Sequence, residues 1–323
     1  MDRFKVFVTD KLSDEALAVF KKHPEFEVTV KTGLTEEQLV KEIPLYDAHI
    51  IRSGTKVTKP VIDAASRLKV IGRAGVGVDN VDIPAAKSKG IAVMNTPLGN
   101  VNSAAEMSAG LMICLARNIH KGHASMARGE WDRKSFVGRE LKGKTLGIIG
   151  VGNVGQILAK IAGGFSMKVI GTSRSKPAEV LKGWGVDKVG MDELLQRSDF
   201  ISINLTLTSE TRYTLDAPQF AKMKKGVYII NAGRGGLINE KALAEAIKSG
   251  VVTGAAIDTW ESEPPAKENP LLSMPQVLMV PHLGASTKEA QENVGIDIAN
   301  QVIDALGKGK IVNCVNGITE LKK

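Results

Sequence analysis

The chain has 323 residues, too many for one typical hydrophobic core, so about two domains are expected. Hydrophobic residues make up 43% and charged residues 24%, as in an ordinary globular protein, and no apolar run approaches the ~20 residues needed to span a membrane. The net charge of +8 comes from dispersed Lys and Arg without interleaved aromatics, which argues against nucleic acid as a partner and fits a small anionic substrate and cofactor.

The N-terminus enters a strand-like pattern at once and leaves no room for a signal peptide, so a cytoplasmic protein without a membrane partner is expected. One disulfide between Cys114 and Cys314 would be possible, but a pair this far apart in the sequence is expected to be two buried free thiols in a reducing compartment. His120 and His123 have no further His or Cys nearby, so no metal site is expected.

The first hundred residues alternate between strand-like and helix-like segments. A capped helix is expected over residues 13–22, between two strands. The expected strands cover residues 5–9, 27–31, 48–51, 69–72 and 92–94. This βαβ rhythm predicts a mostly parallel sheet with right-handed crossovers.

A long apolar helix is expected over residues 103–116, followed by a polar arm over residues 117–144. A second alternating block then begins. Its six expected strands cover residues 145–149, 168–171, 200–203, 227–230, 253–257 and 277–280. A last long helix, residues 288–306, is expected to return to the first block, which makes the first domain discontinuous.

A glycine-rich turn follows the first strand of the second block. In Gly150-Val151-Gly152-Asn153-Val154-Gly155, the first glycine permits a tight turn, the second lets a pyrophosphate approach the backbone, and the third lets helix and strand pack closely. The helix that starts there offers free N–H groups and a partial positive charge. Strand, turn, helix and next strand occur in order, which predicts dinucleotide binding.

The fold class predicted from this organisation is α/β, with two doubly wound parallel sheets. A Rossmann-like cofactor domain of residues 99–287 is inserted in a flavodoxin-like substrate domain of residues 1–98 and 288–323.

The end of the next strand lacks the Asp or Glu expected to bind the adenosine ribose 2′-OH. The sequence has Gly171-Thr172-Ser173-Arg174-Ser175-Lys176 there. Small hydroxyls followed by two cations suit a 2′-phosphate, which predicts that NADP(H) is accepted and preferred over NAD(H). The alternative is that Ser173 binds the ribose weakly while Arg174 is solvated or lies over the adenine.

Three polar groups follow late strands of the second block. Arg234 can bind a substrate carboxylate in a bidentate manner. His282 can exchange a proton near neutral pH, and Glu263 can orient the imidazole and stabilise its charged form. Because ligands bind at the carboxyl ends of strands in open α/β sheets, these groups can converge, although each taken alone could be a structural residue.

Long stretches of the chain resemble the D-2-hydroxyacid dehydrogenase family. The matching segments are residues 73–80, 95–100, 150–155, 231–236, 263–265 and 281–290, so the resemblance covers nearly the whole chain. Residues 72–80 and 281–290 are most similar to the members that act on 3-phosphoglycerate in the first step of serine synthesis. The resemblance implies hydride transfer between a nicotinamide cofactor and a D-2-hydroxy acid.

The resemblance also implies roles by position. Arg234, Glu263 and His282 match the catalytic residues, and Asp258 matches an acid near the nicotinamide carboxamide. The residues that match the substrate-binding positions are Arg52, Ser53, Arg73, Val76, Gly77 and Asn100. The arm around Trp131 and Arg133 resembles a dimer-forming segment, which implies a homodimer.

Four departures from the family pattern stand out. Ser173 replaces the usual Asp, and Asn153 stands where the phosphoglycerate enzymes often have Arg. Asn204 and Thr206 stand beside the cofactor where the family often has His-x-Pro. The chain ends soon after its last helix, so a short form without a regulatory domain is expected.

Three functions therefore remain open. The main hypothesis is interconversion of 3-phosphoglycerate and 3-phosphohydroxypyruvate, supported by Arg52 and Arg73, which can neutralise a phosphate. The second is an NADPH-dependent reductase of glyoxylate, hydroxypyruvate or another 2-keto acid, favoured by the missing ribose carboxylate. The third is a cofactor-sensing scaffold protein, as some relatives are.

Overall fold

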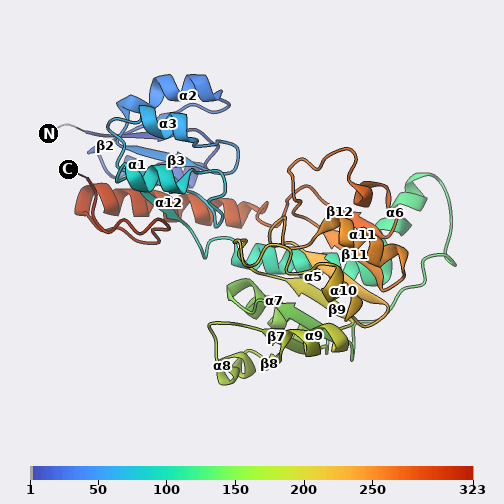
Figure 1. Ribbon diagram of the computed structural model, residues 1–323. Coiled ribbons are helices and arrows are strands. Elements are labelled where there is room, and N and C mark those ends of the chain that lie inside the picture. The colour runs from blue at the N-terminus through green and yellow to red at the C-terminus, as the bar shows by residue number, and fades with distance from the viewer. Residues whose placement is uncertain (1–2, 323) are drawn as a thin grey trace. The chain divides into compact units, whose positions relative to one another are not determined.

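The computed structural model describes residues 3–322, which form two compact units. The first contains the described residues up to Asn100 and those from Thr287 onward, and the second is the continuous segment Val101–Ser286. The chain therefore leaves the first unit once and returns to it once (Figure 1).

The first unit is a parallel sheet with helices on both faces (Figure 1). Its five strands lie in the order β2-β1-β3-β4-β5. In chain order the elements are β1 (Phe4–Val8), α1 (Asp14–Lys21), β2 (Phe26–Val30), α2 (Glu36–Glu42), η1 (Ile43–Leu45), β3 (Ala48–Ile51), α3 (Lys59–Ala64), β4 (Val70–Arg73), α4 (Ile83–Ser88), β5 (Ala92–Asn95) and α12 (Lys288–Lys308). This is the flavodoxin-like order of a doubly wound sheet.

Alternating residues of these strands face two separate hydrophobic clusters. Val6 and Val8 of β1 lie in the cluster with α1 and α12, whereas Phe7 lies in the cluster with α2, α3 and α4. Successive side chains of a strand point to opposite faces, so an unbroken apolar strand needs helices on both sides.

Helix α12 completes one of these faces. It begins after the N-cap Thr287 and ends at Gly309, and it packs against α1 and β4. Val294, Ile298 and Val302 repeat at helical spacing and are buried. Burying three such side chains stabilises by roughly 5–9 kcal/mol, which is comparable to the net stability of a whole domain.

The second unit holds a seven-stranded parallel sheet in the order β12-β11-β10-β9-β6-β7-β8. In chain order its elements are α5 (Val101–Arg117), α6 (Ile119–Ala127), β6 (Thr145–Ile149), α7 (Asn153–Gly164), β7 (Lys168–Thr172), α8 (Ala178–Gly183), β8 (Asp187–Lys188), α9 (Met191–Arg197), β9 (Phe200–Ile203), α10 (Ala217–Ala221), β10 (Val227–Asn231), α11 (Glu240–Lys248), β11 (Val252–Ile257), η2 (Pro270–Ser273) and β12 (Val277–Met279). The winding reverses between β6 and β9, which is where such sheets bind dinucleotides.

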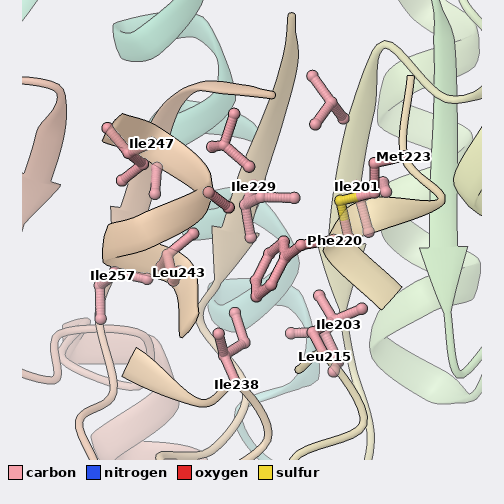
Figure 2. Packing of buried hydrophobic residues seen from close by; sticks show 14 of the residues in the cluster. Ile201, Ile203, Leu215, Phe220, Met223, Ile229, Ile238, Leu243, Ile247 and Ile257 are labelled. Atoms are coloured by element: carbon pink, nitrogen blue, oxygen red, sulfur yellow. The ribbon is translucent and has the colours of Figure 1, made fainter. Parts of the chain in front are cut away.

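One face of this sheet carries the cluster shown in Figure 2. Phe220 of α10 and Leu243 of α11 pack onto Ile201 and Ile229 of the central strands. The opposite face is covered by α5 and α7. Because aromatic residues are only 4% of the chain, both cores consist mostly of aliphatic side chains.

The α/β fold class with two parallel sheets is confirmed, with two differences in detail. The second sheet has a seventh strand, the two-residue β8. The expected polar arm begins with a helix, α6. Cys114 and Cys314 are free thiols, as expected, but both are only half-buried rather than buried. Within residues 3–322, no helix is long and apolar enough to cross a membrane.

Candidate active site

The glycine-rich turn lies between β6 and α7, at the switch point of the second sheet. Gly150 has φ +90°, and a Cβ there would lie 2.8 Å from the carbonyl oxygen of Asn204, so a larger residue would not fit. A Cβ at Gly152 would meet nothing within 4 Å, which leaves the backbone open to a ligand.

These residues fit a dinucleotide pyrophosphate. Gly152 is the N-cap of α7, and Asn153 and Val154 form the first positions of that helix. The N–H groups of a helix start have no partner within the helix and favour an anion. Gly155 is buried, with its Cα so close to the Gly150 carbonyl that a Cβ would lie 3.1 Å from it.

The end of β7 is tied to this turn by Thr172. Its carbonyl oxygen accepts a hydrogen bond from the Val151 N–H at 2.8 Å, and its hydroxyl accepts one from the Gly150 N–H at 3.3 Å. Ser173 is half-buried, whereas Arg174 is 83% exposed and lies 3.8 Å from the Glu210 carboxylate. An exposed ion pair of this length contributes little stability, so Arg174 can move toward a ligand.

Asn204 and Thr206 follow β9, the neighbour of β6. The Asn204 N–H donates to the Ile149 carbonyl at 2.8 Å, and its carboxamide donates to the Ser202 hydroxyl at 3.1 Å. Thr206 is exposed, and its carbonyl accepts a hydrogen bond from the Thr211 hydroxyl at 2.6 Å. Asn204 therefore borders the glycine-rich turn, since its carbonyl lies where a Cβ on Gly150 would meet it.

Glu263 and His282 form a hydrogen-bonded pair. The His282 Nδ1 lies 2.7 Å from the Glu263 Oε2. Partial burial alone would raise the pKa of Glu263, but the His282 hydrogen bond and charge, the Trp260 N–H and the Arg234 charge together lower it. An ionised carboxylate only accepts hydrogen bonds, so Nδ1 carries the proton and Nε2 is the nitrogen that can exchange one.

Asp258 fixes the turn that carries His282. Its two carboxylate oxygens accept hydrogen bonds from the N–H groups of Leu283 at 2.6 Å and Gly284 at 2.8 Å. Its carbonyl accepts one from the His282 N–H at 2.9 Å, and the His282 backbone adopts φ +53°. Burial raises the pKa of Asp258 although these N–H groups oppose the shift. Asp258 thus holds the imidazole in addition to any contact with a cofactor.

Arg234 lies in a loop that folds on Asn231. The Asn231 carboxamide accepts a hydrogen bond from the Gly233 N–H at 3.1 Å and donates to the Arg234 carbonyl at 3.0 Å. The guanidinium donates to the Gly233 carbonyl at 2.8 Å and acts electrostatically on Glu263. The structure therefore brings Glu263 and His282 together, with Arg234 near enough for its charge to lower the pKa of Glu263.

A pair of glutamates that the sequence did not indicate links the loops of Arg234 and Glu263. Glu240 accepts a hydrogen bond from the Glu261 N–H at 2.7 Å, and Glu261 accepts one from the Glu240 N–H at 3.0 Å. The Tyr213 hydroxyl also donates to Glu261, at 2.8 Å. The Glu240 carboxylate thus anchors the loop that carries Glu263, and the Glu261 carboxylate accepts a hydrogen bond from the first residue of α11, which follows the Arg234 loop.

A pocket of about 430 Å³ adjoins the pair. Glu263 and His282 contribute to its wall, and the remaining lining residues are apolar. They are Trp260, Pro264, Pro265, Leu272, Met279, Val280 and Pro281. Within residues 3–322, no group of His, Cys, Asp and Glu is arranged to hold a metal ion.

The other predicted residues lie in the first unit. Arg52 and Ser53 follow β3, and Arg73 ends β4, with Ile51 opposite Arg73 in the register of these neighbouring strands. The Arg73 guanidinium donates to the Ala74 carbonyl at 3.3 Å.

The remaining predicted substrate-binding residues of the first unit are Val76, Gly77 and Asn100. The Val76 carbonyl accepts a hydrogen bond from the Asn95 carboxamide at 2.6 Å. Gly77 and Asn100 are half-buried, and Asn100 is the last residue before the second unit. Arg52, Ser53, Arg73 and Val76 therefore gather at the carboxyl ends of neighbouring strands.

Residues 109–284 match the family described as D-isomer specific 2-hydroxyacid dehydrogenase, NAD binding domain. The chain belongs to this family. The second unit is thus a nicotinamide dinucleotide-binding domain.

Individual relatives agree with this assignment. The chain is 49% identical to D-3-phosphoglycerate dehydrogenase of Methanocaldococcus jannaschii over 97% of its own length and 59% of that protein. It is 45% identical to hydroxypyruvate reductase of Thermotoga maritima, over 95% of its own length and 100% of that protein. The crystal structure of a glyoxylate reductase from Paecilomyes thermophila superposes with a TM-score of 0.86 at 32% identity, covering 98% of this chain and 99% of that one.

Proposed function

We propose that this protein is a nicotinamide-dependent D-2-hydroxyacid dehydrogenase that interconverts 3-phosphoglycerate and 3-phosphohydroxypyruvate, the first reaction of serine synthesis. The observation that carries the proposal is the 2.7 Å pair of Glu263 and His282 beside Arg234, in a domain with a dinucleotide-binding turn. Proton exchange and carboxylate binding are what oxidation of a 2-hydroxy acid requires of the protein.

In the oxidative direction His282 removes the hydroxyl proton through Nε2, and Glu263 stabilises the imidazolium that forms. Arg234 binds the carboxylate and, in reduction, polarises the keto oxygen. The nicotinamide, when bound, accepts or donates the hydride. Asp258 keeps the His282 turn in place throughout.

Two observations favour the phosphorylated substrate. Arg52 follows β3 and Arg73 ends the neighbouring strand β4, and two guanidiniums can neutralise a phosphate. Two relatives named D-3-phosphoglycerate dehydrogenase are 46% and 49% identical, although the chain spans only 59% of their length. We therefore assign substrate binding to the first unit and cofactor binding to the second.

A second candidate is reduction of hydroxypyruvate or glyoxylate. The relative named hydroxypyruvate reductase is matched over its whole length, which favours this candidate. The absent ribose carboxylate at Ser173 favours it as well, because NADPH normally drives reduction.

For the cofactor, we propose that NADP(H) is accepted. Thr172 and Ser173 are small and half-buried, and the exposed Arg174 can pair with a 2′-phosphate. Glu210, at 3.8 Å from Arg174, opposes this through its negative charge. A solved relative at 27% identity is an imino acid reductase in complex with NADPH.

We also propose a homodimer formed through the arm after α6. Trp131 and Val137 in this arm are 76% and 81% exposed, unusually so for large apolar side chains. Burial against a second copy of the chain would remove both from water.

A substrate panel tests the function. We expect the catalytic efficiency with 3-phosphohydroxypyruvate to exceed those with hydroxypyruvate and glyoxylate by roughly 10-fold or more, because a site built for a phosphate discriminates against substrates without one. Each substrate is measured with NADPH and NADH. Higher efficiency with hydroxypyruvate or glyoxylate would establish the second candidate, and a strong NADH preference would contradict the cofactor proposal.

A further inference from the structure

The loop of residues 52–55, which carries Arg52 and Ser53, is held at both ends by two side chains from other elements. The Asp10 Oδ2 accepts hydrogen bonds from the N–H groups of Arg52 at 2.6 Å and Thr55 at 3.0 Å. The Asn80 Nδ2 donates to the carbonyl groups of the same two residues, at 2.7 and 2.6 Å. Four backbone groups are thus fixed by one carboxylate and one carboxamide.

A second tether comes from the residue before Asp10. The Thr55 hydroxyl lies 2.9 Å from the Thr9 hydroxyl, which lies 2.8 Å from the His49 Nε2. His49 is fully buried, and burial lowers its pKa to about 3, so it stays neutral near neutral pH. The end of β1 therefore determines where the 52–55 loop lies.

The middle of the loop is exposed although its ends are fixed. Ser53 and Gly54 are exposed, and within residues 3–322 the structure records no hydrogen bond to their N–H groups. A Cβ at Gly54 would lie 2.6 Å from the Asp10 Oδ1, so the backbone rests directly on the carboxylate. Two N–H groups and one hydroxyl thus remain available to an anion.

The Arg52 guanidinium is held less firmly than its backbone. Its Nη1 lies 3.5 Å from both the Lys11 carbonyl and the Gln291 carboxamide oxygen, at the outer limit of hydrogen bonding. The position of this side chain therefore depends mainly on the position of the loop. A misplacement of about 1 Å can cost up to ~100-fold in rate or binding.

We propose that Asp10 and Asn80 are positioning residues that set the preference for phosphorylated over unphosphorylated substrates, by holding Arg52 and Ser53 where the phosphate binds. The inference rests on the proposed function, in which the 52–55 loop binds that phosphate. Because Asp10 is negatively charged, a positioning role and simple electrostatic repulsion predict opposite effects of removing it. Coulomb repulsion alone predicts tighter phosphate binding when this carboxylate is removed, whereas positioning predicts weaker binding.

The test compares KM and kcat for 3-phosphohydroxypyruvate and hydroxypyruvate in Asp10→Ala, Asp10→Asn and Asn80→Ala. We expect Asp10→Ala and Asn80→Ala to raise KM for the phosphorylated substrate by about 10-fold or more, with kcat and the hydroxypyruvate KM changed less than about 3-fold. Asp10→Asn keeps an oxygen that can accept both N–H groups, so it should restore most of the preference.

Asp47→Ala is the matched control. Asp47 accepts a hydrogen bond from the Lys5 N–H at 2.9 Å and precedes β3 at the opposite end of the same sheet. This variant should lower Tm without changing the ratio of the two KM values. If Asp10→Ala does not fold, Asn80→Ala and Asp10→Asn decide the question.

The variant Arg52→Ala tests the phosphate-binding role of the 52–55 loop separately from the positioning role of Asp10 and Asn80. Suppose that Arg52→Ala raises only the KM for 3-phosphohydroxypyruvate, while Asp10→Ala and Asn80→Ala leave the preference for that substrate over hydroxypyruvate intact. The positioning role of Asp10 and Asn80 is then wrong and the proposed function stands. If Arg52→Ala affects both substrates equally, the phosphate role of the loop is wrong. Tighter phosphate binding in Asp10→Ala would overturn the positioning role in favour of simple repulsion.

Discussion

The backbone of His282 lies in the left-handed region, at φ +53°, where few residues other than glycine are stable. Three hydrogen bonds from the turn to Asp258 hold it there. The Glu263 carboxylate then fixes the tautomer of the ring. The nitrogen that we propose exchanges the proton is thus positioned by two acidic residues: Asp258 holds the backbone turn and Glu263 orients the ring.

His282→Asn tests this assignment. Asparagine tolerates a left-handed backbone but cannot exchange a proton at neutral pH, so the turn should survive while catalysis does not. We expect kcat to fall by ~10²–10⁴-fold, the usual contribution of a positioned acid–base group. Steady-state turnover and cofactor binding, measured by fluorescence, provide the readout. Near-normal turnover in a folded variant would refute the role of His282.

The site residues that could be predicted from the sequence are those that follow the ends of expected strands. Arg234, Glu263 and His282 came from that rule, and Asp10 also lies just beyond a strand, two residues after the end of β1. Its role was missed because a carboxylate that accepts N–H groups 42 and 45 positions away leaves no local pattern. The Glu240 and Glu261 pair was missed for the same reason.

Among the elements, helix α11 does more than cover the sheet. Its first residue, Glu240, is buried and hydrogen-bonded to the loop that carries Glu263. Burial raises the pKa of Glu240, helped by the charge of Glu261 and opposed by the Glu261 N–H and the Asn269 carboxamide. The folded protein therefore holds the Glu240 proton more tightly than the unfolded chain does.

Glu240→Gln should change the pH dependence of stability. A group whose pKa is higher in the folded than in the unfolded protein contributes to the free energy of unfolding. This contribution is fully present below the pKa of the unfolded state and is lost as the pH rises through the pKa of the folded state. From about pH 4 to pH 7, the Tm of the wild type should therefore fall relative to that of Glu240→Gln, as measured by thermal denaturation.

Glu245→Gln provides the control on the same helix, because the Glu245 side chain is 73% exposed. The Tm difference between this variant and the wild type should stay nearly constant over the same range. A constant difference for Glu240→Gln as well would contradict the raised pKa of Glu240.

Elements with a strong apolar pattern were predicted closely. The strands expected at residues 48–51 and 145–149 coincide with β3 and β6. Strand β8 was missed because it has only two residues, both exposed, which form no pattern. Helix α6 was missed because its two large apolar side chains, Ile119 and Met126, are exposed and form no buried face, and its N-cap, Asn118, makes no side-chain capping bond.

At the scale of the whole molecule, the proposed homodimer can be tested through the arm. Combining Trp131→Ala with Val137→Ser should raise the dimer dissociation constant by about 30-fold or more, because truncating a buried aromatic anchor commonly costs 2 kcal/mol or more. Sedimentation velocity over a range of concentrations measures this change.

Leu45→Ala is the control, since Leu45 is 56% exposed but lies in the first unit. It should leave the sedimentation profile unchanged. A wild type that sediments as a monomer at all concentrations, or a double variant that dimerises normally, would rule out this interface.

The return of α12 to the first sheet has a consequence for biosynthesis. The ribosome completes β1 to β5 before the second unit, yet the helix that covers one face of that sheet follows residue 286. At about 5–20 residues per second, synthesis of the intervening segment takes roughly 10–40 s. During this interval the nascent chain exposes the part of the aliphatic face that α12 later covers, an aggregation-prone surface of the kind that chaperones bind.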